Sequence, residues 1–120
     1  MAKILVIDDE RDIRNLLRVL LQSKGYDVVE AENGEAGLSI FQSTSIDLVM
    51  TDILMPDKEG LSTIMDLKKK NSQLKIIAMS GAVKQSAQYL SLARKLGADK
   101  ILAKPFTLQT VLQAVEDLLP

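Results

Sequence analysis

The chain has 120 residues, of which 47% are hydrophobic and 26% charged, as expected for one folded domain and not for a disordered chain. Its 15 basic and 16 acidic residues give a formal net charge of -1, which disfavours direct binding to the phosphates of nucleic acids. The absence of Cys and His excludes disulfides, thiol nucleophiles, Cys/His zinc sites and imidazole acid–base chemistry.

The N-terminal segment reads MAKILVIDDE, and its short apolar run ends at two aspartates. A secretory signal needs a longer apolar stretch and a small-residue cleavage site. No other segment approaches the roughly 20 apolar residues of a membrane span. We therefore expect one domain over residues 1–120, located in the cytoplasm and without membrane insertion.

Short apolar runs alternate with segments of helical period from the N-terminus onward. The run Ile4 to Ile7 predicts a first strand, and apolar residues from Ile13 to Leu21 recur at three- and four-residue spacing, which predicts a helix. Gly25 supplies a left-handed position that ends this helix. A second strand is expected over Asp27 to Ala31, followed by a weaker helix from Asn33 to about Thr44.

The second half of the chain continues the same alternation. A strand over Leu48 to Thr51 precedes a third helix that runs from about Leu61 to Lys70. The remaining strands are Ile76 to Met79 and Ile101 to Ala103. The fourth helix includes Tyr89 to Leu96, and the fifth covers Leu108 to Leu119 after an expected cap at Thr107.

Five strand–helix pairs in strict alternation favour an α/β fold with a parallel sheet covered by helices on both faces. The mostly apolar strands agree with burial on both sides. Right-handed crossovers leave few topologies, and we expect a flavodoxin-like, doubly wound five-stranded parallel sheet of order 2-1-3-4-5 with five helices. The sequence contains no repeat and no linker.

Polar residues directly follow four of the five predicted strands. Ligands of open parallel sheets bind beyond the carboxyl ends of the strands, where the strand order reverses. Each residue alone has an ordinary interpretation, such as a helix N-cap, a turn residue or a solvated charge. In the order 2-1-3-4-5, however, the first and third strands meet at the reversal. The strand-end residues are Asp8, Asp9, Asp52, Ser80 and Lys104.

The three aspartates are therefore expected in one crevice. Crowded carboxylates repel one another, so such a site is costly unless a cation neutralises it. Mg²⁺ suits the residues because it prefers hard oxygen ligands and binds few protein carboxylates. The sequence thus predicts a magnesium site formed by Asp8, Asp9 and Asp52.

Four segments appear in an order and spacing that resemble the receiver domain of bacterial response regulators, the phosphoacceptor module of two-component signalling. The segments are ILVIDDE, DLVMTDILMPDKEG, IIAMSG and LAKPF. The resemblance covers the whole chain. Each segment alone is weak evidence for this family, but the four together are highly specific for it.

The resemblance implies a magnesium-dependent phosphorylation site. Asp52 would be the phosphoacceptor, which attacks a phosphoryl group and becomes an acyl phosphate. Asp8 and Asp9 would bind Mg²⁺ together with Asp52 and the backbone carbonyl of Leu54. Ser80 would be the switch hydroxyl that hydrogen-bonds the new phosphoryl group.

Lys104 would be the active-site lysine, and the bond before Pro105 would be cis, again by resemblance. Many receivers have an aromatic residue three positions before this lysine, and here the residue is Ile101. An inward swing of that ring cannot be transferred to this protein. Leu54 and Ala82 stand where a polar side chain would hold the hydrolytic water, so we expect slow autodephosphorylation and no further enzymatic activity.

The resemblance also implies protein partners. The donor would be a sensor histidine kinase or a His-phosphotransfer protein. A downstream effector or a second receiver would bind the face formed by the fourth helix, the fifth strand and the fifth helix, which includes parts of 85–95 and 109–117. No direct binding of nucleic acid is expected.

Two other functions are compatible with a parallel sheet. An aspartyl-phosphate phosphatase typically has a second Asp two residues after its nucleophile, but here that residue is Leu54. A nucleotide- or flavin-binding module needs a glycine-rich phosphate loop after the first strand. Asp8, Asp9 and Glu10 stand there instead and would repel phosphates.

Overall fold

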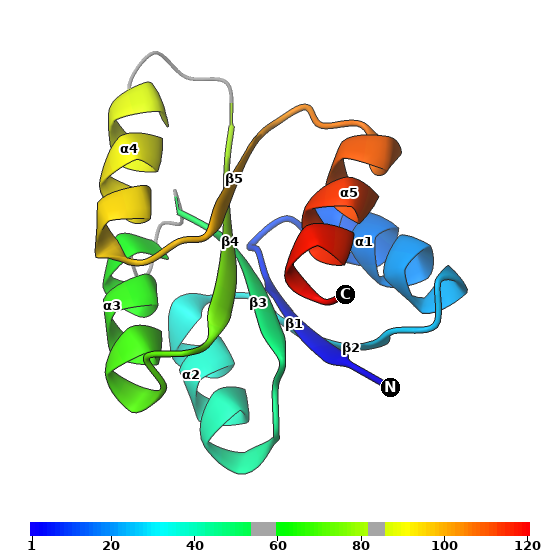
Figure 1. Cartoon of the computed structure of the whole chain (residues 1–120), viewed down its shortest axis with the longest axis horizontal. Helices are drawn as coiled ribbons and strands as arrows, with labels where there is room; N and C mark the ends of the chain where they lie inside the picture. The colour runs from blue at the N-terminus through cyan, green and yellow to red at the C-terminus, as the bar shows by residue number, and fades with distance from the viewer. Residues whose placement is uncertain (54–59, 82–85) are drawn as a thin grey trace.

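The computed structural model describes residues 1–53, 60–81 and 86–120, without the side chains of residues 86, 87, 89 and 90. Within these residues, five strands alternate with five helices (Figure 1). The strands are β1 (Lys3–Ile7), β2 (Asp27–Ala31), β3 (Leu48–Asp52), β4 (Lys75–Ser80) and β5 (Lys100–Ala103). The helices are α1 (Arg11–Ser23), α2 (Gly34–Ser43), α3 (Gly60–Lys70), α4 (Ser86–Leu96) and α5 (Leu108–Leu118).

The sheet is parallel and has the order β2-β1-β3-β4-β5, so the predicted doubly wound topology is confirmed. The strand order reverses between β1 and β3. In the register of these two strands, Ile7 lies opposite Thr51, and Asp52 lies opposite Met79 of β4. Residues that follow Ile7 therefore meet the end of β3 at the carboxyl edge of the sheet.

Helices cover both faces of the sheet (Figure 1). On one face, Leu17 and Leu21 of α1 and Val111 and Val115 of α5 pack against alternate strand residues such as Ile4. On the opposite face, α2, α3 and α4 cover the intervening strand residues. Because both faces are buried, the strands read as apolar runs and not as an alternating pattern.

The helix N-termini show which polar residues act as N-caps and which do not. Asn33 and Thr107 accept hydrogen bonds from Ala36 N and Thr110 N, so both cap their helices. The N-cap of α1 is Glu10, which makes no side-chain capping bond. The ordinary interpretation of Asp8 and Asp9 as N-caps is therefore wrong. No helix in the described part of the chain is long and apolar enough to cross a membrane.

Gly60, the first residue of α3, lets that helix start directly against the end of β3. A Cβ at this position would overlap the backbone of Asp52 and Ile53. A backbone cannot move aside as the tip of a flexible side chain can, so the absence of a side chain at Gly60 sets the position of the β3 end.

We predict that Gly60→Ala lowers the unfolding free energy by about 1–3 kcal/mol, because the added methyl overpacks against the β3 backbone. Urea denaturation measures the change. Gly81→Ala is the matched control, since a Cβ there would meet no described atom within 4 Å. Equal stability of the two variants would contradict the proposed role of Gly60.

Candidate functional site

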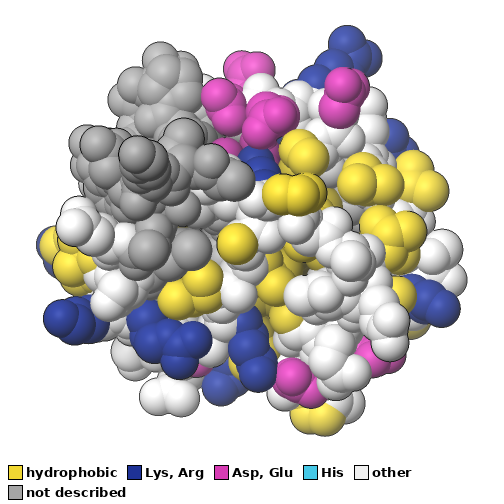
Figure 2. Space-filling model, turned by 90° about the horizontal axis from the view of Figure 1, so that it is seen from above, with side chains coloured by type: hydrophobic (Ala, Val, Ile, Leu, Met, Phe, Trp, Pro, Cys, Tyr) yellow, Lys and Arg dark blue, Asp and Glu magenta, His cyan; other side chains and the backbone are white. Residues whose placement is uncertain are grey.

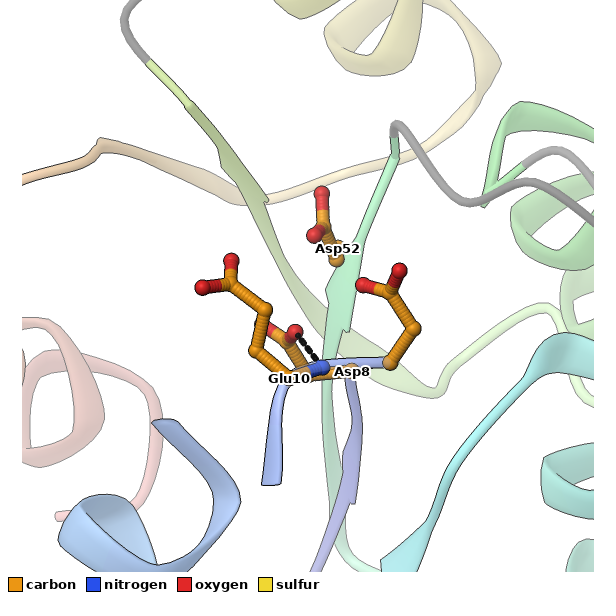
Figure 3. Close-up of side chains that lie close together, drawn as sticks. Asp8, Glu10 and Asp52 are labelled. Carbon is orange, nitrogen blue, oxygen red and sulfur yellow. Dashed lines mark hydrogen bonds between the residues drawn. The ribbon is translucent and has the colours of Figure 1, made fainter. Parts of the chain in front are cut away.

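Four acidic side chains gather at the carboxyl edge of the sheet. One carboxylate oxygen from each of Asp8, Asp9, Glu10 and Asp52 lies within 4.8 Å of the others. Figure 3 shows Asp8 and Glu10 beyond the end of β1 and Asp52 at the end of β3. Asp8 and Asp52 are buried, whereas Asp9 and Glu10 are exposed. The view from above shows acidic side chains clustered on this edge, bordered by a basic one (Figure 2).

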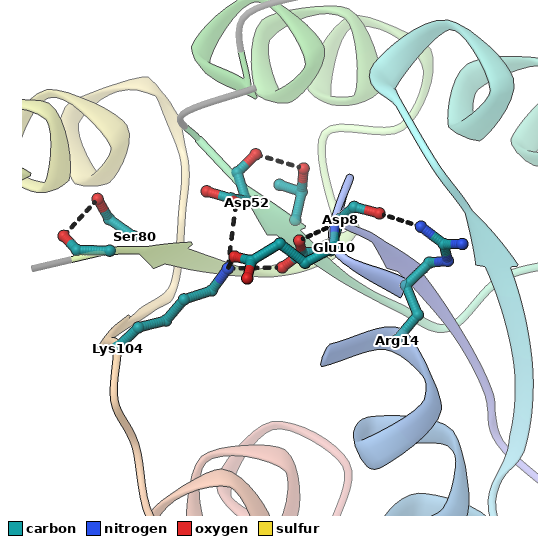
Figure 4. A network of polar contacts seen from close by, with 8 residues as sticks. Asp8, Glu10, Arg14, Asp52, Ser80 and Lys104 are labelled. Atoms are coloured by element: carbon teal, nitrogen blue, oxygen red, sulfur yellow. Dashed lines mark hydrogen bonds and ion pairs between the residues drawn. The ribbon is translucent and has the colours of Figure 1, made fainter. Parts of the chain in front are cut away.

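Lys104 neutralises part of this acidic cluster. Its Nζ lies 2.8 Å from Asp8 Oδ2, 3.1 Å from Glu10 Oε1 and 3.1 Å from Asp52 Oδ2 (Figure 4). The Lys104 side chain is only 11% exposed. The mutual repulsion expected for the three aspartates is therefore offset by an ammonium group of the protein itself. The Lys104–Pro105 peptide bond is cis, as the resemblance implied.

The burial of these charges shifts two pKa values. Burial raises the pKa of Asp8 above its usual value of 3.8, although the hydrogen bonds from Lys104 and from the Glu10 backbone act in the opposite direction. Burial alone would lower the pKa of Lys104, but the hydrogen bond to Asp8 and the charges of Asp52 and Asp8 together raise it. Lys104 therefore stays positively charged.

The backbone around Asp8 is held on several sides. Its N–H donates to Ala31 O of β2 at 3.1 Å, and its Oδ1 accepts from Glu10 N at 2.9 Å. Its carbonyl oxygen accepts from Arg14 Nη1 at 2.7 Å (Figure 4). These three bonds leave Asp8 Oδ2 directed at Lys104. The turn between β1 and α1 is thus fixed by a contact to β2 and a contact to α1.

Ser80 and Lys104 are linked through the backbone. Ser80 is buried at the end of β4, and its carbonyl oxygen accepts from Lys104 N at 2.6 Å. Its hydroxyl makes a long contact of 3.4 Å to Gly81 O. No described atom lies within 4 Å of a Cβ built at Gly81, so the space beside Ser80 is open on that side.

The donor set fits a hard divalent cation. All four clustered side chains offer carboxylate oxygens, which are the ligands that Mg²⁺ prefers, and the cluster contains no nitrogen or sulfur ligand. The exposed side chains of Asp9 and Glu10 leave the site open to solvent, as a cation that retains several waters requires. The fourth expected ligand, Leu54, lies outside the described residues, as does Ala82.

The structure brings together all the strand-end residues singled out from the sequence, and it adds two more. Glu10 joins the acidic cluster and contacts Lys104, although the sequence pointed to it only as an obstacle to phosphate binding. Its position next to Asp9 was the available signal. Arg14 contacts a backbone oxygen, and no sequence pattern predicts such a contact.

Comparisons with known proteins agree with this arrangement. The family model of the response regulator receiver domain matches residues 4–116. The transcriptional regulatory protein CpxR of Escherichia coli K12 is 38% identical over 106 residues, which are 88% of this chain and 44% of that protein. The chemotaxis protein CheY of Halobacterium salinarum is 36% identical over 120 residues, 99% of this chain and 98% of that protein. The chain therefore spans less than half the length of CpxR and nearly the whole length of this CheY.

Solved structures extend the similarity to the whole fold. A receiver domain protein from Clostridium thermocellum has a TM-score of 0.92 at 36% identity, covering 99% of this chain and 94% of that one. The response regulator protein TrrA from Thermotoga maritima, solved in complex with Mg²⁺-BeF, has a TM-score of 0.86 at 39% identity, covering 98% and 99%. Because the family model matches residues 4–116 and solved receiver domains share the fold over nearly the whole chain, the chain belongs to the response regulator receiver domain family, the regulatory unit of two-component response regulators.

Proposed function

We propose that Asp52 accepts a phosphoryl group in a magnesium-dependent reaction, and that residues 1–120 act as one receiver unit in the cytoplasm. The observation that carries this proposal is the position of Asp52. Its buried carboxylate lies where the strand order reverses, 3.1 Å from the Lys104 ammonium and within a group of carboxylates able to hold a cation. Ligands of such sheets bind at this reversal.

The chemistry follows from the neighbours of Asp52. A carboxylate oxygen of Asp52 attacks phosphorus, the bond between phosphorus and the donor atom breaks, and an acyl phosphate forms. The donor is the phosphohistidine of a sensor histidine kinase or a His-phosphotransfer protein. Lys104 offers its positive charge to the oxygens of the transferred group. The Ser80 hydroxyl then donates to a phosphoryl oxygen, since the open space beside Gly81 leaves room for it.

Asp8, Asp9 and Asp52, together with the backbone carbonyl of Leu54, would hold Mg²⁺. The ion would neutralise the negative charges that otherwise keep a carboxylate and an incoming phosphoryl group apart. The four clustered acids and Lys104 carry more negative than positive charge, which supports the binding of a divalent cation. Family membership disfavours the alternative of an aspartyl-phosphate phosphatase, because the relatives are regulators.

We predict that Asp52→Asn abolishes phosphorylation by acetyl phosphate and Mg²⁺, because the amide is not a nucleophile. Intact-mass spectrometry measures the added phosphoryl mass. Asp27→Asn is the control, since it removes an exposed acid from the opposite end of the sheet. Phosphorylation of Asp52→Asn at the wild-type rate would identify a different acceptor.

We predict that Asp8→Asn raises the melting temperature of the protein in metal-free buffer and removes its stabilisation by Mg²⁺. The raised pKa of Asp8 means that ionisation costs stability, so the wild type loses stability as the pH rises from 3.8 through the raised pKa. The advantage of the variant therefore develops over this range and is complete above it. Asparagine keeps an oxygen for the Glu10 N–H.

Thermal unfolding with and without Mg²⁺ at several pH values provides the test. Glu116→Gln is the control because it removes an exposed acid on α5, far in sequence from the cluster. This control should keep the full magnesium response. A metal-free Asp8→Asn variant that melts well below the wild type would mean that the ion pair with Lys104 outweighs the cost of burial.

The output surface is proposed to be the face formed by α4, β5 and α5. A pocket of about 420 Å³ lies between β5 and α5, with Ile101 among its apolar lining residues and Gln113 and Asp117 among its polar ones. On α4, Leu92 is 44% exposed. Apolar surface within a polar surround is a common feature of protein-binding sites. A downstream effector or a second receiver is the proposed partner, and nucleic acid is not.

We predict that the phosphoryl mimic beryllofluoride, added with Mg²⁺, changes amide hydrogen exchange in α4, β5 and α5. The expected cause is a movement of Ser80 or Lys104, which share a backbone hydrogen bond at the start of this face. Asp52→Asn serves as the control and should show no change. Changes restricted to the residues around Asp52 would contradict this choice of output surface.

A further inference from the structure

We propose that Arg14 is a positioning residue of the magnesium site, which holds the turn between β1 and α1 so that Asp8 and Asp9 present their carboxylates correctly. This inference rests on the proposed function, because it assigns a role toward the cation that the reaction requires. Arg14 does not touch the reacting atoms. It acts on the backbone that carries two of the proposed ligands.

The contact between Arg14 and the turn is short and shielded. Arg14 lies in the first turn of α1, and its Nη1 donates to the carbonyl oxygen of Asp8 at 2.7 Å. The Arg14 side chain is only 15% exposed. Its own N–H donates to Glu10 O at 3.1 Å, so both its backbone and its side chain hold the same short segment. Hydrogen bonds from a charged donor are among the stronger ones in proteins.

The guanidinium group is itself anchored from β2. Glu30 Oε1 lies 3.5 Å from Arg14 Nε, and Glu30 Oε2 lies 2.9 Å from Arg18 Nε. The neighbouring residue of β2, Ala31, accepts the Asp8 N–H at 3.1 Å. The two peptide groups of Asp8 are thus fixed from β2, one directly and the other through Arg14. Figure 4 shows Arg14 reaching from α1 to the Asp8 backbone.

Arg14 and Lys104 act on Asp8 in different ways. Lys104 contacts the Asp8 carboxylate, the group through which Asp8 would also bind a cation. Arg14 contacts the Asp8 carbonyl and leaves the carboxylate available. Its hydrogen bond can therefore persist when a cation binds. Mg²⁺ demands a nearly ideal octahedral arrangement of ligands, so a ligand segment that is free to shift would bind it less tightly.

Removing groups that orient metal ligands typically lowers metal affinity by 10- to 100-fold. We therefore expect Arg14→Gln to weaken Mg²⁺ binding roughly 10-fold. Arg18→Gln is the matched control, because it loses the shorter ion pair to the same Glu30 from the same helix, while Arg18 contacts Asn15 and Glu30 and none of the described residues of the turn. We expect Mg²⁺ affinity within about twofold of wild type for that control, and a partial recovery of affinity in Arg14→Lys.

Isothermal titration calorimetry with MgCl₂ gives the affinities without any phosphorylation. Initial rates with acetyl phosphate, measured against Mg²⁺ concentration, give the second readout. We expect Arg14→Gln to raise the half-saturating Mg²⁺ concentration by the same factor as it lowers affinity. The rate at saturating Mg²⁺ should remain near that of the wild type, since Asp52, Ser80 and Lys104 are unchanged.

Two results would overturn the proposal: an unchanged affinity in Arg14→Gln, whatever its saturating rate, or an equal loss of affinity in Arg14→Gln and Arg18→Gln. Urea denaturation shows whether Arg14→Gln is folded. If it is not, the Mg²⁺ affinity of Arg14→Lys decides, and an affinity equal to that of the wild type would count against the proposal. Wild-type protein that binds Mg²⁺ but gains no phosphoryl group would overturn the proposed function, while the affinities would still test the role of Arg14.

Discussion

The ammonium group of Lys104 among buried carboxylates is the contact on which the site depends. Asp8 and Asp52 lose water on folding, and ionised carboxylates are costly to bury unless a cation neutralises them. The compensating charge comes from the end of β5, an edge strand that is separated from β3 by β4. Only a long side chain can reach across that distance, and the four-carbon stem of a lysine does so. One ion-pair cluster therefore ties β1, β3 and β5 together at the same edge of the sheet.

The same contact makes the site responsive. Four carboxylates lie around one ammonium group, so negative charge exceeds positive charge. Burial raises the pKa of Asp8, and the negative charge of Asp52 acts in the same direction. A divalent cation bound by the carboxylates would take over their neutralisation. Lys104 would then be released from Asp8 toward a group on Asp52. The proposed cation and phosphoryl group could thus replace the contacts that Lys104 makes with Asp8 and Asp52. A site whose positive and negative charges already balanced would have less tendency to bind them.

The sequence predicts well those features that depend on a pattern along the chain. Alternating apolar runs and helical periods predicted every element, and the parallel order placed the polar residues after Ile7, Thr51, Met79 and Ala103 at one edge. Glu10 and Arg14 escaped prediction for a physical reason. Glu10 joins the cluster because the turn after β1 folds its side chain toward Lys104, and Arg14 contacts a backbone oxygen that every residue possesses. Such contacts depend on the turn geometry, which no residue spacing encodes.

Ile101 raises the question of how a change at Asp52 reaches the outer face without an aromatic side chain at that position. The backbone offers a route. Ser80 O accepts from Lys104 N at 2.6 Å, so the two residues proposed to contact the phosphoryl group are joined directly, and Lys104 follows β5 without a break. A displacement of either residue acts on β5, which carries Ile101 at the pocket between β5 and α5. Since packed elements move as units and resist continuous deformation, a small shift of this strand end alters the pocket. We infer that β5 itself can carry the signal. Ser80 ends β4, Lys104 directly follows β5, and β5 both pairs with β4 and lines the outer pocket with Ile101.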